Sequence, residues 1–474
     1  MRKTNAIKRT REILVVVFEY FVLYRFNSHR HESLPVRMRR ACEDLGLVFI
    51  KLGQLLSTRY DLLPKSYCEE LQKLLDDVTS FEFDVVKNTI ENDFKKSLPE
   101  LYVEFDPIPV ASASIAQVYK ATTHAGNIVA VKIRRPHVDR AIASDMKIFR
   151  ILALIAQIFS GNLRHINLRH ILKQLEEWLH AEVDFFNEAN NIQNMQDYYQ
   201  RLAHQESGEY AQAIEFPHVY NELSSQNVLV MSFIEGIPVR KWRDVENNPE
   251  YDVEASLKAS LVATMRAWMN EEHSLVFHGD PHPSNMLLLP NGRIALLDFG
   301  LVGYFDKKNI TETRELFLAV YAKDLEKSIE AALALCNAPK EKYAKRIRED
   351  MKQYLKKTRT QSLGFWFFEI LRMFVKHRIP MSYDLTAFGR SQAIIDGVFQ
   401  SVMPDTPTVD ILGDELKRAL RKKIFDNLQS IDIAPIAYTL SEKAKQSPEK
   451  VTDFINRYFD DPFQFLRDVR EAVK

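Results

Sequence analysis

The stretch of residues 278–300, HGDPHPSNMLLLPNGRIALLDFG, constrains the fold more than any other part of the chain. It contains two short apolar runs, residues 286–289 and 293–297, with Pro-Asn-Gly at 290–292 between them. Asn-Gly between apolar runs is the strongest short-range signal for a β-hairpin. The sequence therefore predicts two strands lying side by side. This pairing would bring the residues before the first strand next to those after the second.

Three polar side chains flank this predicted hairpin. Asp280 and Asn285 precede the first strand, and Asp298 follows the second within Asp-Phe-Gly. An Asp that accepts a substrate proton, with an Asn and an Asp-Phe-Gly that bind Mg²⁺ through hard oxygen ligands, forms the phosphoryl-transfer half of a kinase active site. We therefore expect Asp280 to be catalytic, Asn285 and Asp298 to bind metal, and ATP with Mg²⁺ to be the cofactors. A strand followed by an ordinary turn is the structural alternative.

Length and composition narrow the class of protein. At 474 residues the chain is long enough for two or three domains. Its 46% apolar and 27% charged residues are typical of a globular protein rather than a disordered or multi-span membrane protein. The 64 basic and 64 acidic residues cancel, so no overall field attracts nucleic acid and no nucleic-acid partner is expected. The three cysteines match no zinc or redox spacing, which favours a reducing compartment.

Two strands with kinase-like features are predicted earlier in the chain. Residues 111–119, ASASIAQVY, and residues 128–133, IVAVKI, flank a short Ala-Gly-Asn loop. In protein kinases the first strand pair carries a glycine-rich loop over the phosphates, and Val-Ala-Val-Lys places a lysine on the α- and β-phosphates; Lys132 fits that lysine. Alanine lacks the conformational freedom of glycine, so phosphate contact here would differ in geometry. The expected cofactor-binding residues of this loop are Ala111, Ser112, Ala113 and Ser114.

Residues 168–199 have the pattern of one long helix, and three acids lie within it: Glu182, Asp184 and Glu188. A kinase site needs a lysine–glutamate pair, so one of these acids should meet Lys132, whereas solvated carboxylates are the alternative. After this helix, residues 213–231 read as strands. Residues 231–235 then lie where a nucleotide hinge should be, with Met231 and Phe233 in a mostly apolar cleft.

The N-terminal region combines basic and apolar residues. Residues 1–40 hold ten Lys or Arg against three Glu, and residues 13–24 are apolar except for Glu19. A basic, aromatic-rich helix can lie on an anionic membrane, and packing on the core or on a partner subunit is the equally weighted alternative.

From Met38 onward, apolar residues recur at helical spacing, and KLGQ, residues 51–54, lies within this predicted amphipathic helix. After Gly300 the pattern is helical, with a Phe-rich core segment at 365–374 and no chemistry indicated for 431–474.

Together these motifs resemble the UbiB family, also called AarF or ADCK, of atypical protein-kinase-like proteins. The resemblance covers roughly residues 35–405 and rests on KLGQ, ASASIAQVY, VAVKIRRP, the acids of 182–190, HGDPHPSN and DFG. It implies an α+β, two-lobed protein-kinase-like fold with an N-terminal helical extension and a helix-rich C-terminal lobe. It also implies ATP and Mg²⁺ binding and a role in ubiquinone or related isoprenoid-lipid metabolism. Many bacterial relatives carry C-terminal transmembrane helices, and no apolar run of 18 residues is present here.

Residue roles follow from the same resemblance. Lys132 would contact phosphate, with Glu188 as its ion-pair partner. The regulatory residues would be the Glu-Xaa-Asp element and the helical extension facing it, namely Glu182, Asp184, Lys51 and Gln54. We also expect Ala113 to stiffen the phosphate-covering turn and Lys51 to pair with Glu182 or Asp184, so that peptides are kept out of the cleft.

The resulting prediction divides the chain into five segments: a basic amphipathic helix (1–35), the KLGQ extension (36–100), an N-lobe (101–235), a C-lobe with the catalytic loop and DFG (236–410) and a helical tail (411–474). The favoured function is an ATPase or kinase of a non-protein substrate that supports isoprenoid-lipid biosynthesis. A nucleotide-switched, pseudokinase-like scaffold for isoprenoid lipid or biosynthetic enzymes, and a small-molecule phosphotransferase, are the alternatives. The expected location is the cytoplasm, peripheral to the inner membrane, in a bacterium, or the matrix side of a mitochondrion in a eukaryote.

Overall fold

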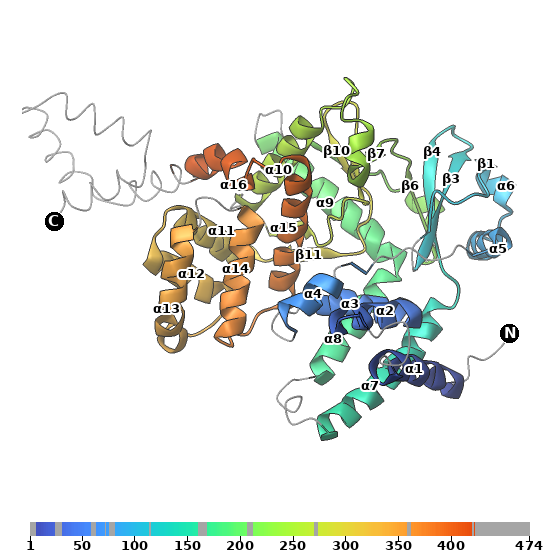
Figure 1. Ribbon diagram of the computed structural model, residues 1–474. Helices are drawn as coiled ribbons and strands as arrows, with labels where there is room; N and C mark the ends of the chain where they lie inside the picture. The colour runs from blue at the N-terminus through green and yellow to red at the C-terminus, as the bar shows by residue number, and fades with distance from the viewer. Residues whose placement is uncertain are drawn as a thin grey trace, which may run out of the picture.

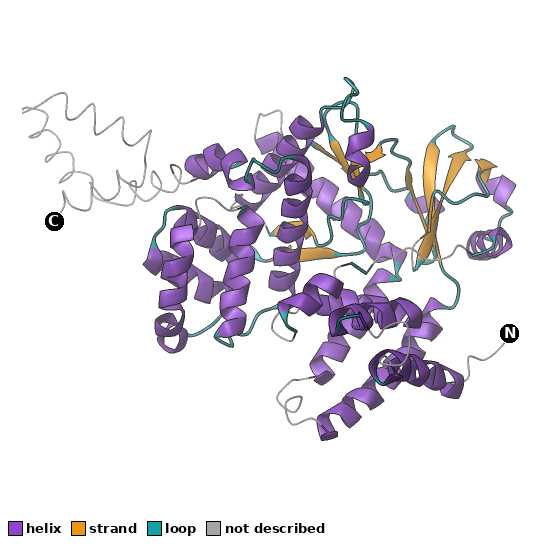
Figure 2. Cartoon of the chain, in the orientation of Figure 1, coloured by secondary structure: helices purple, strands orange, loops and turns teal. Residues whose placement is uncertain are grey.

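The computed structural model of the chain has two lobes and an N-terminal helical extension (Figure 1). A small lobe is built on an antiparallel sheet, and a larger lobe consists mostly of helices (Figure 2). The predicted α+β class with a helix-rich C-terminal part is confirmed. The structure describes residues 6–23, 31–57, 63–71, 73–74, 81–112, 115–159, 168–205, 212–269, 274–357, 362–419 and 421.

The N-lobe sheet has the strand order β1-β3-β4-β6, with β2 paired to β3. The side chains of β4 lie in two different environments, one on each face of the sheet, since successive side chains of a strand point to opposite faces. Val129, Val131 and Ile133 are fully buried in an apolar cluster with α5, whereas Ala130 and Lys132 face α9 (Phe185–Gln205). The elements of this lobe are α5 (Phe83–Phe94), α6 (Leu98–Leu101), β1 (Tyr102–Phe105), β2 (Ala111–Ser112), β3 (Ala116–Thr123), β4 (Ile128–Arg134), β6 (Val228–Ser232) and the 3₁₀ turn η5 (Asn221–Leu223).

The long helix predicted over residues 168–199 is wrong in one respect, because it is two helices. α8 (Leu168–Glu182) ends just before α9 (Phe185–Gln205) begins. Between them, the Asp184 carboxylate accepts a hydrogen bond from the Phe186 N–H at 3.1 Å. A short acidic side chain that satisfies a free N–H of the first turn favours a helix start, so Asp184 begins α9 rather than extending α8.

The helical extension also differs from the single amphipathic helix that the sequence predicts. α2 (Leu34–Leu45) and α3 (Leu47–Ser57) are separated by Gly46, whose φ is +81°. The Gly46 N–H donates to the carbonyls of Cys42 and Glu43 at 3.0 and 3.2 Å, which ends α2. The apolar spacing runs through both helices, and the break therefore reorients the KLGQ segment on α3. The short helix α4 (Lys65–Leu71) packs against both.

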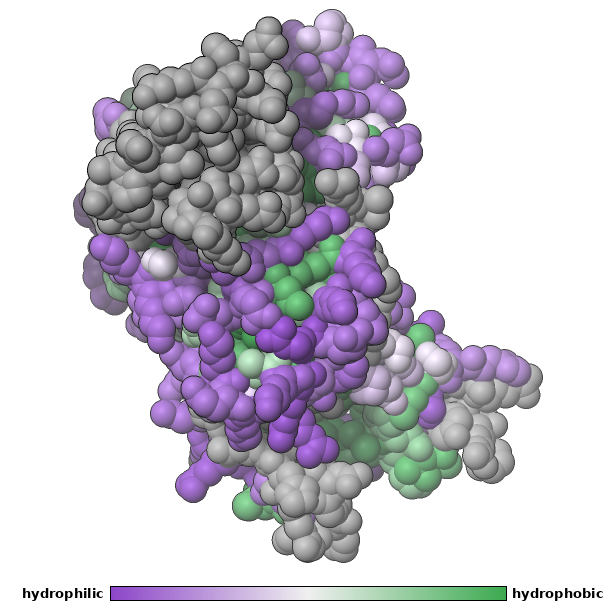
Figure 3. Space-filling model, turned by 90° about the vertical axis from the view of Figure 1, so that its left-hand side faces the viewer, coloured by the Kyte–Doolittle hydropathy of each residue, from purple (hydrophilic) through white to green (hydrophobic). Residues whose placement is uncertain are grey.

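The first helix, α1 (Ala6–Phe21), is docked on α2 and on α7 (Val138–Phe159). Arg9 donates to both carboxylate oxygens of Asp145 on α7, at 2.9 and 2.7 Å, and Tyr20 donates to Asp44 on α2 at 2.7 Å. The opposite face of α1 is apolar and exposed. Figure 3 shows green atoms gathered at the lower right, at the level where α1 and α7 lie in Figure 1. The exposed apolar residues are Leu14, Val15, Val17, Phe18, Val22 and Leu23, with Ile151 and Leu154 on α7.

The C-lobe combines a four-stranded and a two-stranded sheet with a helical array. Phe367 and Phe374 of the Phe-rich segment are buried, which confirms a core role for that segment. Among the described helices, none has the length and apolarity to cross a membrane. The elements are β5 (Ile214–Glu215), β7 (Ile237–Pro238), η6 (Val239–Asp244), α10 (Val253–Met269), β8 (Leu275–His278), β9 (Met286–Leu288), β10 (Ile294–Leu296), β11 (Val302–Phe305), α11 (Lys307–Tyr321), α12 (Leu325–Leu335), α13 (Lys340–Lys357), α14 (Leu363–Lys376), α15 (Tyr383–Val402) and α16 (Thr408–Ile411).

Candidate active site

The predicted hairpin is confirmed. β9 and β10 pair antiparallel, with Met286 opposite Leu296 and Leu288 opposite Ile294. Gly292 adopts a φ of +74° in the turn between them, a conformation that glycine reaches without strain. Just beyond the paired residues, the Leu297 N–H donates to the Asn285 carbonyl at 3.0 Å. The hairpin thus places Asn285 beside the residue that precedes Asp298.

A second strand pair, which the sequence did not indicate, completes the approach of Asp280 to Asp298. β8 enters the catalytic loop and β11 leaves the Asp-Phe-Gly segment, and His278 lies opposite Val302 in their antiparallel ladder. The Gly279 N–H donates to the Leu301 carbonyl at 2.9 Å, which extends this pairing toward the loop. Two ladders therefore position Asp280, Asn285 and Asp298; the strands β9 and β10 are buried, and β8 and β11 are partly buried.

Lys132 pairs with Glu188 across the small lobe. The Lys132 Nζ lies 2.7 and 2.8 Å from the two carboxylate oxygens of Glu188, and the residues are 6% and 2% exposed. The same Nζ lies 3.7 Å from Asp298 Oδ2. Glu188 Oε1 also accepts the Phe299 N–H at 3.3 Å. One carboxylate thus joins β4, α9 and the Asp-Phe-Gly segment.

The charged groups of this cluster shift one another's pKa values. Burial raises the pKa of Glu188, and the nearby Asp298 raises it further, against the opposing effect of Lys132. Burial alone would lower the pKa of Lys132, but the charges of Asp298 and Glu188 outweigh it and the net pKa is raised. For Asp298, burial is outweighed by Lys132 and by the Gly300 N–H, which donates at 2.9 Å, so its pKa is lowered. Lys132 is held protonated and Asp298 ionised, which suits them to bind phosphate and metal respectively.

The KLGQ helix reaches the same cluster. Lys51 on α3 is 4% exposed and forms a close ion pair with Glu182 at the end of α8. A Cβ added to Gly300 would lie 3.6 Å from Glu182 Cγ, so this pair sits directly against the Asp-Phe-Gly turn. The Gln54 amide is buried and donates to the Leu74 carbonyl at 3.3 Å. Of the two acids proposed to meet Lys51, Glu182 makes the contact.

The alanine-rich loop is only partly described. Ala111 and Ser112 form β2 and pair with Val118 and Gln117 on β3, whereas Ala113 and Ser114 lie outside the described residues. The expectation that Ala113 stiffens the turn therefore stays a prediction. Gln117 is fully buried, and its amide donates to Ser112 Oγ at 3.4 Å. This buried glutamine fixes the start of the loop.

The hinge segment, residues 231–235, begins in the last two residues of β6. Met231 is buried opposite Ala130 of β4. The Phe233 N–H donates to the Ile128 carbonyl at 3.1 Å, and the Phe233 ring lies 4.7 Å from the Lys120 Nζ. The Phe233 N–H is thus engaged within the protein.

Comparison with known proteins identifies the family. The family model for the ABC1 atypical kinase-like domain matches residues 73–332. The chain belongs to the ABC1 atypical kinase-like family. An uncharacterized protein of the hydrogenase 1 5′ region in Clostridium pasteurianum is 28% identical over 461 residues, covering 95% of this chain and 83% of that protein. An uncharacterized chloroplastic aarF domain-containing protein kinase of Arabidopsis thaliana is 30% identical over 301 residues, covering 63% and 54%.

Among solved structures, the complex of Rv3197 with erythromycin from Mycobacterium tuberculosis matches at 21% identity and a TM-score of 0.44, covering 85% of this chain and 99% of that one. The family match confirms the resemblance to UbiB and AarF proteins drawn from the motifs. This ABC1 chain is accordingly kinase-like.

Two residues near the ABC1 site, Asn191 and Arg390, were not found by sequence reasoning. Asn191 on α9 donates to the Phe299 carbonyl at 2.9 Å and accepts the Tyr304 hydroxyl at 2.8 Å, so it fixes the Asp-Phe-Gly backbone to the helix that carries Glu188. Arg390 on α15 forms an ion pair with Asp280. The position of Asn191, three residues after Glu188 and so on the same helix face, was a usable signal. No sequence signal pointed to Arg390, because it lies far along the chain from Asp280 in an ordinary helical pattern.

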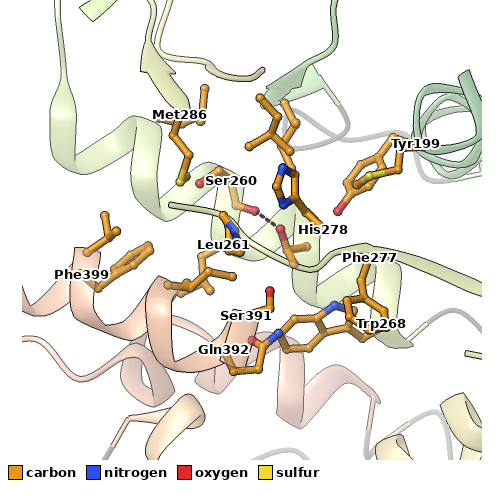
Figure 4. Close-up of a pocket in the computed structure, with 18 residues that line it drawn as sticks. Tyr199, Ser260, Leu261, Trp268, Phe277, His278, Met286, Ser391, Gln392 and Phe399 are labelled. Carbon is orange, nitrogen blue, oxygen red and sulfur yellow. Dashed lines mark hydrogen bonds between the residues drawn. The ribbon is translucent and has the colours of Figure 1, made fainter. Parts of the chain in front are cut away.

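A small cavity lies behind the catalytic loop (Figure 4). It has a volume of about 50 Å³, which suits a water molecule or two and is far too small for a nucleotide. His278 and Pro281 of the loop line one side, and Ser391 and Gln392 of α15 line another. The cavity therefore marks where α15 packs beneath the loop that carries Asp280.

Proposed function

We propose that this ABC1 protein binds MgATP between its lobes and transfers the γ-phosphoryl group to water or to a non-protein acceptor. The observation that carries the proposal is the joined cluster of Lys132, Glu188 and Asp298, next to Asp280 and Asn285. In phosphoryl transfer the protein supplies mainly position and charge, and these residues supply both.

Each side chain has a definite task in this proposal. Asp298 and Asn285 would bind Mg²⁺, which needs only one or two protein oxygens because water and substrate phosphates complete its octahedral shell. Lys132, held by Glu188, would bind the α- and β-phosphates. Asp280 would accept the proton of the attacking hydroxyl or water. The bound metal would neutralise charge on the phosphates during transfer.

A non-protein acceptor is proposed because of the KLGQ helix. Lys51 and Glu182 pair against Gly300, on the part of the cleft beside the Asp-Phe-Gly turn. A helix packed there leaves little room for an extended peptide. The same packing supports the second candidate, a nucleotide-switched scaffold, since an extension whose Lys51 charge acts on Asp298 could respond to bound nucleotide.

An isoprenoid or quinone-pathway lipid is the proposed substrate class, with ubiquinone-biosynthesis enzymes as possible partners. One experiment separates these functions. ATP turnover is measured with and without liposomes and phenolic lipid precursors, in the wild type and in Asp298→Ala. Turnover that is stimulated by lipid and lost in the variant supports the enzyme. MgATP binding with no turnover under any of these conditions favours the scaffold.

Peripheral membrane contact is proposed for the exposed face of α1 and α7 (Figure 3). Leu14 and Phe18 are 54% and 50% exposed, one helical turn apart, and Lys8 and Arg11 add positive charge to the same helix. An amphipathic basic helix binds anionic lipid by burying such side chains. The opposite face stays docked through Arg9, so α1 can meet a membrane without leaving the protein.

We expect the double substitution Leu14→Glu with Phe18→Glu to reduce sedimentation with anionic liposomes several-fold, because it places charge where apolar atoms would enter the membrane. MgATP binding should be unchanged. Val103→Glu is the matched control, since Val103 is 65% exposed on β1 of the N-lobe. Equal sedimentation of the wild type and the double variant would reject α1 as the membrane contact.

A further inference from the structure

Helix α15 brings a cation to the catalytic loop from a distant part of the chain. The Arg390 Nη2 lies 3.1 Å from Asp280 Oδ2, and the two side chains are 14% and 30% exposed. The other carboxylate oxygen, Oδ1, is buried and has no hydrogen-bond partner within the described part of the chain. Arg390 is therefore the side chain that holds the Asp280 carboxylate in its orientation.

The helix that carries Arg390 is itself firmly fixed. On α15, Asp396 accepts hydrogen bonds from the Phe365 N–H and the Thr408 hydroxyl, each at 2.9 Å, and from the Ser362 hydroxyl. Gly389 packs so closely on α14 that an added Cβ would lie 2.5 Å from Leu371 Cδ1. Contacts on both sides of Arg390 thus restrict movement of the helix, and a supporting side chain on a rigid element is preorganised.

The catalytic loop has no cation of its own. Residues 278–292 contain no lysine or arginine, although Asp280 and Asp298 lie close together and ATP would add further negative charge. Lys132 already forms ion pairs with Glu188 and Asp298. A carboxylate in such surroundings, without a partner, would be repelled and would turn away from the acceptor.

We propose that Arg390 is a positioning residue for catalysis, which holds the Asp280 carboxylate facing the acceptor hydroxyl or water. This inference rests on the proposed function, because it assigns Arg390 a role through Asp280. A misplacement of about 1 Å can cost about 100-fold in rate. Loss of Arg390 should therefore lower kcat by roughly 10- to 100-fold. It should change the KM for ATP little, because the ion pair of Arg390 among the described residues is with Asp280 rather than with Asp298.

The test is a double-mutant cycle on ATP turnover, which isolates coupling between two residues. The variants are Arg390→Met, Arg390→Lys, Asp280→Asn and the combination of Arg390→Met with Asp280→Asn. We expect Arg390→Met to lower kcat about 10- to 100-fold in the wild-type background but less than about 3-fold in the Asp280→Asn background. Arg390→Lys should recover part of the rate, since it restores the charge without the planar fork of arginine. Arg372→Met, which removes an exposed pair with Glu369 on α14, is the control and should turn over like the wild type.

The outcomes distinguish failure of the proposed role of Arg390 from failure of the proposed function. If Asp280→Asn impairs turnover while Arg390→Met does not, or if Arg390→Met costs as much in the Asp280→Asn background, the role of Arg390 is refuted and the proposed function stands. If the wild type turns over no ATP, or Asp280→Asn turns over at the wild-type rate, the proposed role of Asp280 fails and the inference fails with it. Thermal shifts with MgATP, unchanged in Arg390→Met, show that the variant is folded and binds nucleotide.

Discussion

Asp298→Asn should reduce ATP turnover by about 100-fold or more, the scale of losing one preorganised electrostatic contact in an active site. The substitution keeps the size of the side chain, and an amide oxygen can still accept the Gly300 N–H. It removes the charge that Lys132 holds in place and that Mg²⁺ would meet. The triphosphate then lacks part of its counter-charge, so MgATP binding should weaken as well.

The measurement for Asp298→Asn is turnover together with the thermal shift produced by MgATP. Asp350→Asn is the matched control, because Asp350 on α13 pairs with Lys376 and His377 far from the cleft. A shift with MgATP as large in Asp298→Asn as in the wild type would show that Asp298 does not bind the metal.

Lys51→Ala is expected to destabilise the protein by about 3 kcal/mol and to raise autophosphorylation above the wild-type level. Breaking a buried ion pair is costly because the remaining charge is left without its partner, and Lys51 is 4% exposed. Glu182 would then lose the cation that holds the KLGQ helix against the Asp-Phe-Gly turn. The extension should loosen and admit peptide segments to the cleft.

Two measurements check the Lys51 prediction: the free energy of unfolding, and incorporation of label from the γ-phosphate of ATP. Lys120→Ala is the control, since its pair with Glu235 has side chains 39% and 74% exposed and should contribute less than about 1 kcal/mol. Adding Asp298→Ala should abolish any labelling. If Lys51→Ala binds MgATP and labels no more than the wild type, the KLGQ helix does not exclude peptides and is better interpreted as part of the substrate site.

Local patterns predicted the parts of the site that depend on short stretches of chain. The β9–β10 hairpin followed from Asn-Gly between apolar runs, and the strand that carries Lys132 followed from the Ala-Gly-Asn turn before it and its resemblance to the Val-Ala-Val-Lys strand of kinases. The breaks at Gly46 and Asp184 were missed because apolar spacing continues across each of them. Periodicity reports which face is buried, and it does not report a change in helix direction.

Contacts between distant segments could not be predicted from the sequence for a different reason. The β8–β11 ladder and the pair of Arg390 with Asp280 depend on how the C-lobe packs, and no spacing in the sequence encodes that packing. The engaged N–H of Phe233 likewise depends on the end of the β4–β6 ladder. A single sequence can therefore suggest the residue types of the site, while their mutual orientation needs the fold.

The double role of Glu188 would couple opening of the cleft to disassembly of the proposed phosphate site. Its carboxylate binds Lys132 from the sheet and the Phe299 N–H from the C-lobe, so rotating the N-lobe away must break at least one of these bonds. A lysine left behind in the small lobe would then lose its counter-ion as the cleft opens. Nucleotide that binds only the closed arrangement would shift the population toward it, by no more than its difference in affinity for the two arrangements. If the protein binds nucleotide as proposed, Glu188 would thereby set an energetic threshold for nucleotide exchange, although we expect it to contact neither the base nor the acceptor.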